Sequence, residues 1–173
     1  RPAAKLDAGV EAAVVRLTKA KEVQIKGDAM ELLGETRDKK FADIFLEQLN
    51  DPSYEVIDQA SLALARVKDP RAFDALAKLT STPSWKGRIQ MAGLNALAEL
   101  GDPRAFETGY KMATDKELSV LIRTAAVVVV GKTGKGDTRA FPLIFDKFKA
   151  AFNSGNVQGI QNGIIAIVKL GDP

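Results

Sequence analysis

Few side chains in this 173-residue sequence have types and spacing that could support chemistry. Residues 126–133, Ala-Val-Val-Val-Val-Gly-Lys-Thr, satisfy the loose pattern of a phosphate-binding loop, in which glycine-rich backbone between a strand and a helix wraps the phosphates. Here the four central residues are valines inside a helical register, so we expect no nucleotide site. We place Lys132 and Thr133 in a turn after that helix.

Two pairs of carboxylates are the other catalytic candidates, Asp51 with Glu55 and Asp115 with Glu117. Hydrolytic acid–base work needs two carboxyls that face each other across a cleft and have pKa values driven apart. Both pairs instead lie where a helix is about to begin, and the helix dipole favours acidic side chains there. We interpret them as structural.

The composition removes most other chemistry. The sequence contains neither His nor Cys, which excludes Ser-His-Asp and Cys-His catalysis, histidine or thiolate metal sites, and disulfides within this chain. We therefore expect no catalytic residue, no metal and no cofactor here. No window approaches the ~18 consecutive apolar residues of a membrane span, so we expect no membrane insertion. The sequence does not indicate a cellular compartment.

The net charge of +3 comes from 25 basic and 22 acidic side chains, and it is not spread evenly. The first 131 residues are balanced, whereas residues 132–173 carry six basic and three acidic side chains. A nucleic-acid surface needs a broad basic stripe because several phosphates must be neutralised together. This distribution argues against a nucleic-acid partner.

An internal repeat of about 33 residues organises the chain. Asp-Pro-Arg-Ala-Phe begins at Asp69 and at Asp102, and it returns as Asp-Thr-Arg-Ala-Phe at Asp137. A second series of landmarks, spaced 32 to 38 residues apart, consists of Ile25, Ile57, Ile89, Ile122 and Ile160. Two landmark series in one register establish the repeat.

Each repeat is predicted to form two antiparallel helices, because apolar residues recur at helical spacing and glycine or proline marks the ends. The expected pairs are 7–20 with 22–34, 41–50 with 53–67, 73–79 with 85–100, 105–114 with 117–131, and 140–152 with 156–170. Val127–Val130 favours a strand by propensity, but the register keeps it helical. The predicted fold is an all-α, right-handed α-solenoid of about five pairs. It forms one domain with repeats 1–36, 37–68, 69–101, 102–136 and 137–173.

The Gly-Asp-Pro-Arg-Ala junction at 101–105, its partial copy at 68–72, and Ile-Arg-Thr-Ala-Ala at 122–126 resemble HEAT repeats, and more closely the HEAT-like type of phycobilisome lyases. The resemblance covers essentially the whole chain and implies fold rather than function.

Residues 84–85 with 92–104 also resemble the C-terminal helical region of bacterial aminopeptidase N family zinc peptidases. That resemblance implies a non-catalytic fragment of a longer chain, whose catalytic domain lies before Arg1.

The candidate interaction surface is the face lined by the second helices. The residue after each landmark isoleucine gives a ladder of mixed charge: Lys26, Asp58, Gln90, Arg123 and Gln161. A nucleic-acid groove would repeat Lys or Arg there, which also argues against a base-excising HEAT-like protein. Tyr54 and Trp85 are expected at equivalent starts of successive second helices, either as a partner's anchor or as filler between repeats.

The leading functional hypothesis is a non-catalytic scaffold that binds a protein or packs against a neighbouring domain. The alternative is the helical domain of a zinc aminopeptidase. We also expect Ile164, Ile167 and Val168 to be exposed on the last helix pair, which predicts self-association through the terminal repeat.

Overall fold

The computed structural model describes residues 3–171, which form ten α-helices and two short 3-10 turns. Every regular element in this range is helical, so the predicted all-α fold is confirmed. The chain divides into two compact units, Arg1–Leu100 (unit 1) and Gly101–Pro173 (unit 2). The prediction of a single domain stays a prediction.

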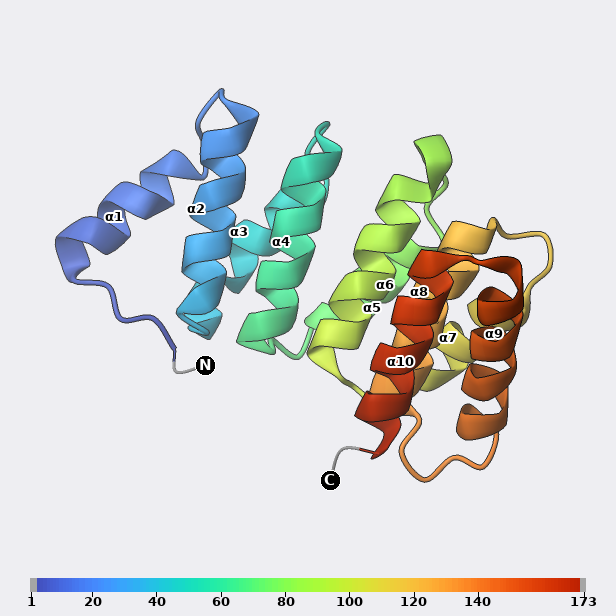
Figure 1. Ribbon diagram of the computed structural model, residues 1–173. Helices are drawn as coiled ribbons and strands as arrows, with labels where there is room; N and C mark the ends of the chain where they lie inside the picture. Colours follow the sequence, from blue (N-terminus) through green and yellow to red (C-terminus); the bar gives the residue numbers. More distant parts are fainter. Residues whose placement is uncertain (1–2, 172–173) are drawn as a thin grey trace. The chain divides into compact units, whose positions relative to one another are not determined.

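Unit 1 consists of three helix pairs (Figure 1). The first helices are α1 (Ala8–Leu17), α3 (Ala42–Gln48) and α5 (Ala72–Thr80). The second helices are α2 (Val23–Glu35), α4 (Tyr54–Val67) and α6 (Arg88–Leu100). The 3-10 turns are η1 (Lys39–Phe41) and η2 (Trp85–Gly87). The second helices pack side by side, and each first helix packs on the second helix of its own pair. We call the set α2, α4 and α6 the second-helix layer of unit 1.

Unit 2 repeats this plan with two pairs. Its helices are α7 (Ala105–Thr114), α8 (Val120–Thr133), α9 (Ala140–Ser154) and α10 (Val157–Gly171). α7 packs on α8, α9 packs on α10, and α8 packs against α10. Across both units, every helix bound lies within three residues of its predicted position.

The repeated Asp-Pro-Arg-Ala sequence starts the first helix of a pair. The Asp69 carboxylate accepts a hydrogen bond of 2.9 Å from the backbone N–H of Arg71, as an aspartate does in an Asx turn. The Arg71 guanidinium folds back onto the same carboxylate and lowers the pKa of Asp69. The same arrangement, with the same distance, recurs at Asp102 with Arg104 and at Asp137 with Arg139. The motif is therefore a helix-start device.

The junction arginines also connect consecutive first helices within each unit. Arg71 pairs with Asp43 of α3 at 2.7 Å, and Arg139 pairs with Glu107 of α7. These pairs are exposed, so each contributes at most about 1 kcal/mol to stability. Their effect is to hold register between neighbouring repeats.

Neighbouring second helices approach closely where glycine meets alanine. A Cβ placed on Gly34 of α2 would lie 2.8 Å from the Cα of Ala63 in α4. A Cβ on Gly131 of α8 would overlap the Cα of Ala166 in α10. Because real Cβ atoms do not come so close to backbone, only glycine permits these two contacts.

Helix α8 corrects one expectation and confirms another. The valine run is helical as predicted, and Val127, Val129 and Val130 are buried, so packing overrides strand propensity. Lys132 and Thr133, however, belong to α8 and not to a turn. Gly131 does not end the helix because it serves the contact with α10, and the buried Thr133 donates its hydroxyl to the Val129 carbonyl at 2.7 Å.

The isoleucine landmarks hold only in part. Ile57 and Ile122 are buried, whereas Ile25 is 40% exposed. In α2 the buried positions that face α4 include Met30 and Gly34 instead. The first repeat therefore departs from the register of the others. Ile25 matches the spacing of the isoleucine series by coincidence.

The glycine contact gives a stability prediction. Gly131→Ala should destabilise the protein by about 1–3 kcal/mol, because α8 and α10 must separate to admit the methyl group. Gly27→Ala is the matched control, since its Cβ would meet the Gln59 side chain at an ordinary 3.6 Å. It should be neutral or stabilising by up to about 1 kcal/mol. Urea unfolding measures both, and equal effects would contradict the close packing.

Candidate interaction surface

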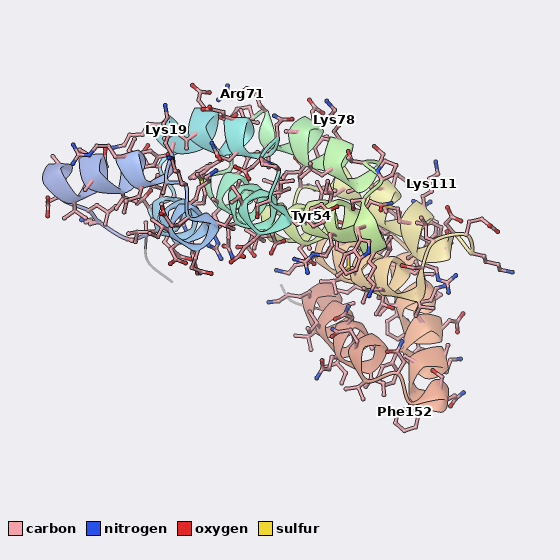
Figure 2. All side chains as sticks on the ribbon, turned by 90° about the horizontal axis from the view of Figure 1, so that it is seen from above. Lys19, Tyr54, Arg71, Lys78, Lys111 and Phe152 are labelled. Atoms are coloured by element: carbon pink, nitrogen blue, oxygen red, sulfur yellow. The ribbon has the colours of Figure 1, made fainter. Side chains whose placement is uncertain are left out.

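The second-helix layer of unit 1 carries most of the candidate residues. Figure 2 shows Tyr54 on this layer and Arg71 and Lys78 on the first-helix layer. Asp58 lies one turn further along α4, and Gln90 lies in the first turn of α6. Tyr54, Asp58 and Gln90 are each partly exposed.

Trp85 is the most prominent apolar side chain beside this layer. It lies in η2, three residues before α6, whereas Tyr54 is the first residue of α4. We expected the two positions to be equivalent, and in the structure they are not. The backbone kinks here, with φ of 51° at Lys86 and 68° at Gly87. The indole is 64% exposed, and the Lys86 ammonium lies 4.5 Å from its ring centre. The ring does not fill the gap between repeats.

Tyr54 and Trp85 nevertheless meet. The backbone N–H of Trp85 donates to the Tyr54 hydroxyl at 3.4 Å, a long hydrogen bond that joins the start of α4 to the turn before α6. The start of α4, with Tyr54, and the turn before α6, with Trp85, are therefore adjacent at the same end of the layer.

A polar groove of about 150 Å³ runs between α4 and α6 next to this aromatic pair. It is lined by Tyr54, Asp58, Arg88, Met91, Ala92 and Asn95. Burial raises the pKa of the Asp58 carboxyl; Arg88 opposes the shift and Glu55 adds to it. Within residues 3–171 this carboxylate has no hydrogen bond or ion pair. It is a partly desolvated negative charge that a cation from a partner could satisfy.

Lys26 has a different role from the one predicted. Its ammonium pairs with the Asp51 carboxylate at 2.6 Å, and both side chains are largely buried. The other Asp51 oxygen accepts from the backbone N–H of Ser53 at 2.8 Å. Lys26 thus fixes α2 to the turn before α4 and is not available to a partner.

In each carboxylate pair the aspartate has a structural contact, and the interpretation of the pairs as non-catalytic stays a prediction. Asp51 serves the turn and the Lys26 ion pair, and Asp115 accepts from the backbone N–H of Glu117 at 2.9 Å. Neither pair faces across a groove. Among the described residues, no group of three acidic side chains could hold a metal ion, and no helix is long and apolar enough to cross a membrane.

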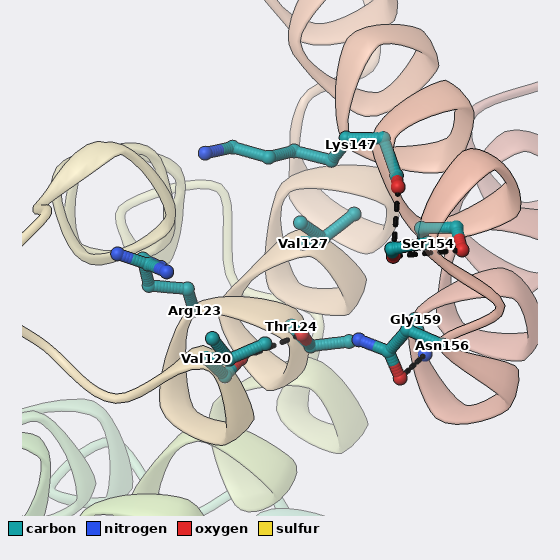
Figure 3. Close-up of a pocket in the computed structure, with 10 residues that line it drawn as sticks. Val120, Arg123, Thr124, Val127, Lys147, Ser154, Asn156 and Gly159 are labelled. Atoms are coloured by element: carbon teal, nitrogen blue, oxygen red, sulfur yellow. Dashed lines mark hydrogen bonds between the residues drawn. The ribbon is translucent and has the colours of Figure 1, made fainter.

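In unit 2 the candidates lie on two helices that pack together, α8 and α10. Gln161 is exposed on α10, while Arg123 of α8 lines a pocket of about 190 Å³ together with Lys147 of α9 (Figure 3). The structure therefore brings Arg123 beside a residue that the sequence did not single out. Lys147 was missed because the ladder followed second helices alone, and α9 is a first helix.

Comparisons with known proteins agree with this architecture. Residues 10–93 match the sequence profile of HEAT repeats, and no curated protein matches the chain significantly. The chain is similar to a chain in the complex of CpcE and CpcF of phycocyanin lyase from Nostoc sp. PCC7120. The TM-score is 0.68 with 18% identity, covering 100% of this chain and 68% of that one.

Two engineered proteins are also similar. One is described only as an engineered protein, with a TM-score of 0.56 and 17% identity over 95% of this chain and 81% of that one. The other is a designed armadillo repeat protein in complex with the peptide (KR)4, with a TM-score of 0.56 and 16% identity over 94% and 82%. The fold is thus a HEAT-like and armadillo-like solenoid. None of these proteins is an aminopeptidase, so that narrower resemblance stays a prediction.

Asp58 gives a pH prediction. Because burial raises its pKa in the folded state above the usual 3.8, the folded protein holds this proton more tightly, and the carboxylate costs stability as pH rises through that range. Asp58→Asn should therefore be more stable than the wild type at pH 7, and its advantage should shrink as pH falls toward 4. Urea unfolding of both proteins across this range measures the difference. A difference that does not change with pH would contradict the desolvated carboxylate.

Proposed function

We propose that this chain is a non-catalytic scaffold that binds a segment of a partner protein, or of a neighbouring domain, on the second-helix layer of unit 1. The observation that carries the proposal is the exposed Trp85 indole beside Tyr54 and the polar groove of α4 and α6. An exposed tryptophan next to a groove is the usual anchor of a protein interface, because it buries a large area at small entropic cost.

The charges of unit 1 support a protein partner. Its sequence contains fifteen basic and fifteen acidic side chains, so it offers no net field for a polyanion. Asp58 supplies a local negative charge within the groove, which would suit a lysine or arginine of the bound segment. The proposal assigns no catalytic step, metal or cofactor to this chain.

The designed armadillo protein provides a parallel. It is in complex with the peptide (KR)4, which shows that a stack of helical repeats with a similar fold can bind a peptide. At 16% identity the likeness extends to the fold alone. It supports the mode of binding that we propose and says nothing about the sequence of this chain's partner.

The proposal is tested by selecting binding peptides from a displayed library and measuring their affinity for variants. Trp85→Ala should weaken binding about 30-fold or more, as expected for an anchor worth ~2 kcal/mol. It should change the free energy of unfolding by no more than about 0.5 kcal/mol, because the ring is exposed. Phe152→Ala is the matched control, since that ring is 66% exposed in unit 2.

Loss of affinity in Trp85→Ala with unchanged stability and normal affinity in Phe152→Ala supports the proposal. Peptides that bind both variants as well as the wild type would refute it. A substantial drop in melting temperature for Trp85→Ala would show that the ring stabilises the fold instead.

A narrower proposal rests on residues 84–85 and 92–104, which resemble the C-terminal helical region of bacterial aminopeptidase N family zinc peptidases. In that case the neighbouring domain would be catalytic and would supply the His-Glu-x-x-His motif that this sequence lacks. Reading the coding region before Arg1 decides the matter. The motif with a downstream glutamate supports this version, and an upstream region without it removes this version while leaving the scaffold proposal intact.

Self-association through the last helix pair is a further part of the proposal. α10 exposes Ile164 and Val168 on the same face, one turn apart, and Ile167 is partly exposed beside them. Apolar residues at this spacing form a continuous stripe on a helix. Ile164→Glu should lower the apparent mass in sedimentation equilibrium at high protein concentration. A mass that is monomeric for the wild type would contradict the prediction.

A further inference from the structure

A pocket in unit 2 has a different character from the groove of unit 1. It lies between α8, α9 and the start of α10, and its volume is about 190 Å³ (Figure 3). Val120, Val127 and Ala150 provide apolar walls, and Arg123 and Lys147 provide two positive charges. No carboxylate lines it.

The positive charges gather on one side of this pocket. Figure 3 shows the Arg123 and Lys147 side chains reaching to the same side, away from Ser154 and Asn156. A third cation, Lys116, lies outside the pocket lining but near enough for its charge to act on Lys147, and its backbone carbonyl accepts a hydrogen bond of 3.1 Å from the Arg123 guanidinium. Burial, followed by the charges of Arg123 and Lys116, lowers the pKa of Lys147.

None of these three cations is neutralised. Within residues 3–171, neither Arg123 nor either lysine forms an ion pair with a carboxylate. The charge of the whole unit has the same sign, since its sequence holds ten basic and seven acidic side chains. Like charges that converge without a counter-ion repel one another, and a bound anion would relieve that repulsion.

The remaining polar groups of the pocket are already engaged. Thr124 donates its hydroxyl to the Val120 carbonyl at 2.6 Å, and Ser154 donates to the Ala150 carbonyl at 2.9 Å. The Asn156 carbonyl oxygen accepts from the backbone N–H of Gly159 at 3.1 Å, which leaves its amide N–H₂ unused. The groups still free to bind are thus N–H donors, which is the chemistry that recognises an oxyanion.

We propose that this pocket binds the phosphate group of a phosphate monoester, with the phosphate held by Arg123 and Lys147 and the organic part of the ester against Val127 and Ala150. A phosphate fits better than a carboxylate because it brings up to two negative charges and three acceptor oxygens to a pocket that is lined by two cations and no carboxylate. The site goes beyond the proposed function, since it lies in unit 2 and needs no residue of the unit 1 surface.

The test is an NMR titration of the full chain with inorganic phosphate and, separately, with acetate at the same ionic strength and pH. Phosphate should shift the backbone amides of Thr124, Val127 and Gly159 along a saturating curve. Lys147→Ala should weaken this binding at least 10-fold. Lys149→Ala is the matched control, because it removes the same charge from the same helix at a position outside the pocket.

Two further probes distinguish the source of the phosphate. Glycerol phosphate represents a small free ester, and a short phosphoserine peptide represents a modified protein; tighter binding of either than of inorganic phosphate supports the site. The proposal is overturned if phosphate and acetate shift the same amides equally without saturation. It is also overturned if Lys149→Ala weakens binding as much as Lys147→Ala.

Discussion

The close contact between neighbouring second helices is the constraint on which the rest of the structure depends. In unit 1 Gly34 meets Ala63, and in unit 2 Gly131 meets Ala166, each across two helices whose backbones nearly touch. A side chain at either glycine would force the helices apart. These contacts set the distance between α2 and α4 in unit 1 and between α8 and α10 in unit 2.

The Asp-x-Arg-Ala junctions at Asp69, Asp102 and Asp137 fix the starts of the first helices α5, α7 and α9. An aspartate binds the backbone N–H two residues later, and an arginine returns to the same carboxylate. The arginine also lowers the pKa of the aspartate, so the carboxylate keeps its charge to a lower pH than a free aspartate would. Helices that start at fixed points and pack at fixed spacing leave the turns before the second helices free to vary. Trp85 lies in such a turn.

Much of the fold could be predicted from sequence because its signals are local and repeated. The Asp-Pro-Arg-Ala junctions are located by short-range hydrogen bonds, and the valine run could be kept helical because the repeat fixed its place. The failures occur where a residue's role depends on a distant partner. Gly131 is a residue type that often ends a helix, but here it lies inside α8, where it contacts Ala166 of α10. Ile25 has the right spacing, but the packing of α2 leaves it 40% exposed.

The candidate site was less predictable for the same reason. Lys26 belongs to the expected ladder, yet its burial against Asp51 turns it into a structural ion pair. Trp85 is exposed next to a left-handed residue at Lys86, a backbone conformation that no local propensity requires. Lys147 gains its significance from Arg123 and Lys116, which are more than twenty residues away in the chain. The sequence therefore predicted the second-helix layer, and the structure identified which side chains on and beside the helices are exposed.

The most direct measurement is site-specific photo-crosslinking in an extract of the source organism. A photoreactive phenylalanine replaces Trp85 in one protein and the exposed Lys78 of α5, on the first-helix layer, in another. The account predicts a discrete crosslinked product from position 85 and none from position 78. Crosslinking from position 78 alone, or equally from both positions, would contradict the claim that the second-helix layer of unit 1 holds the partner.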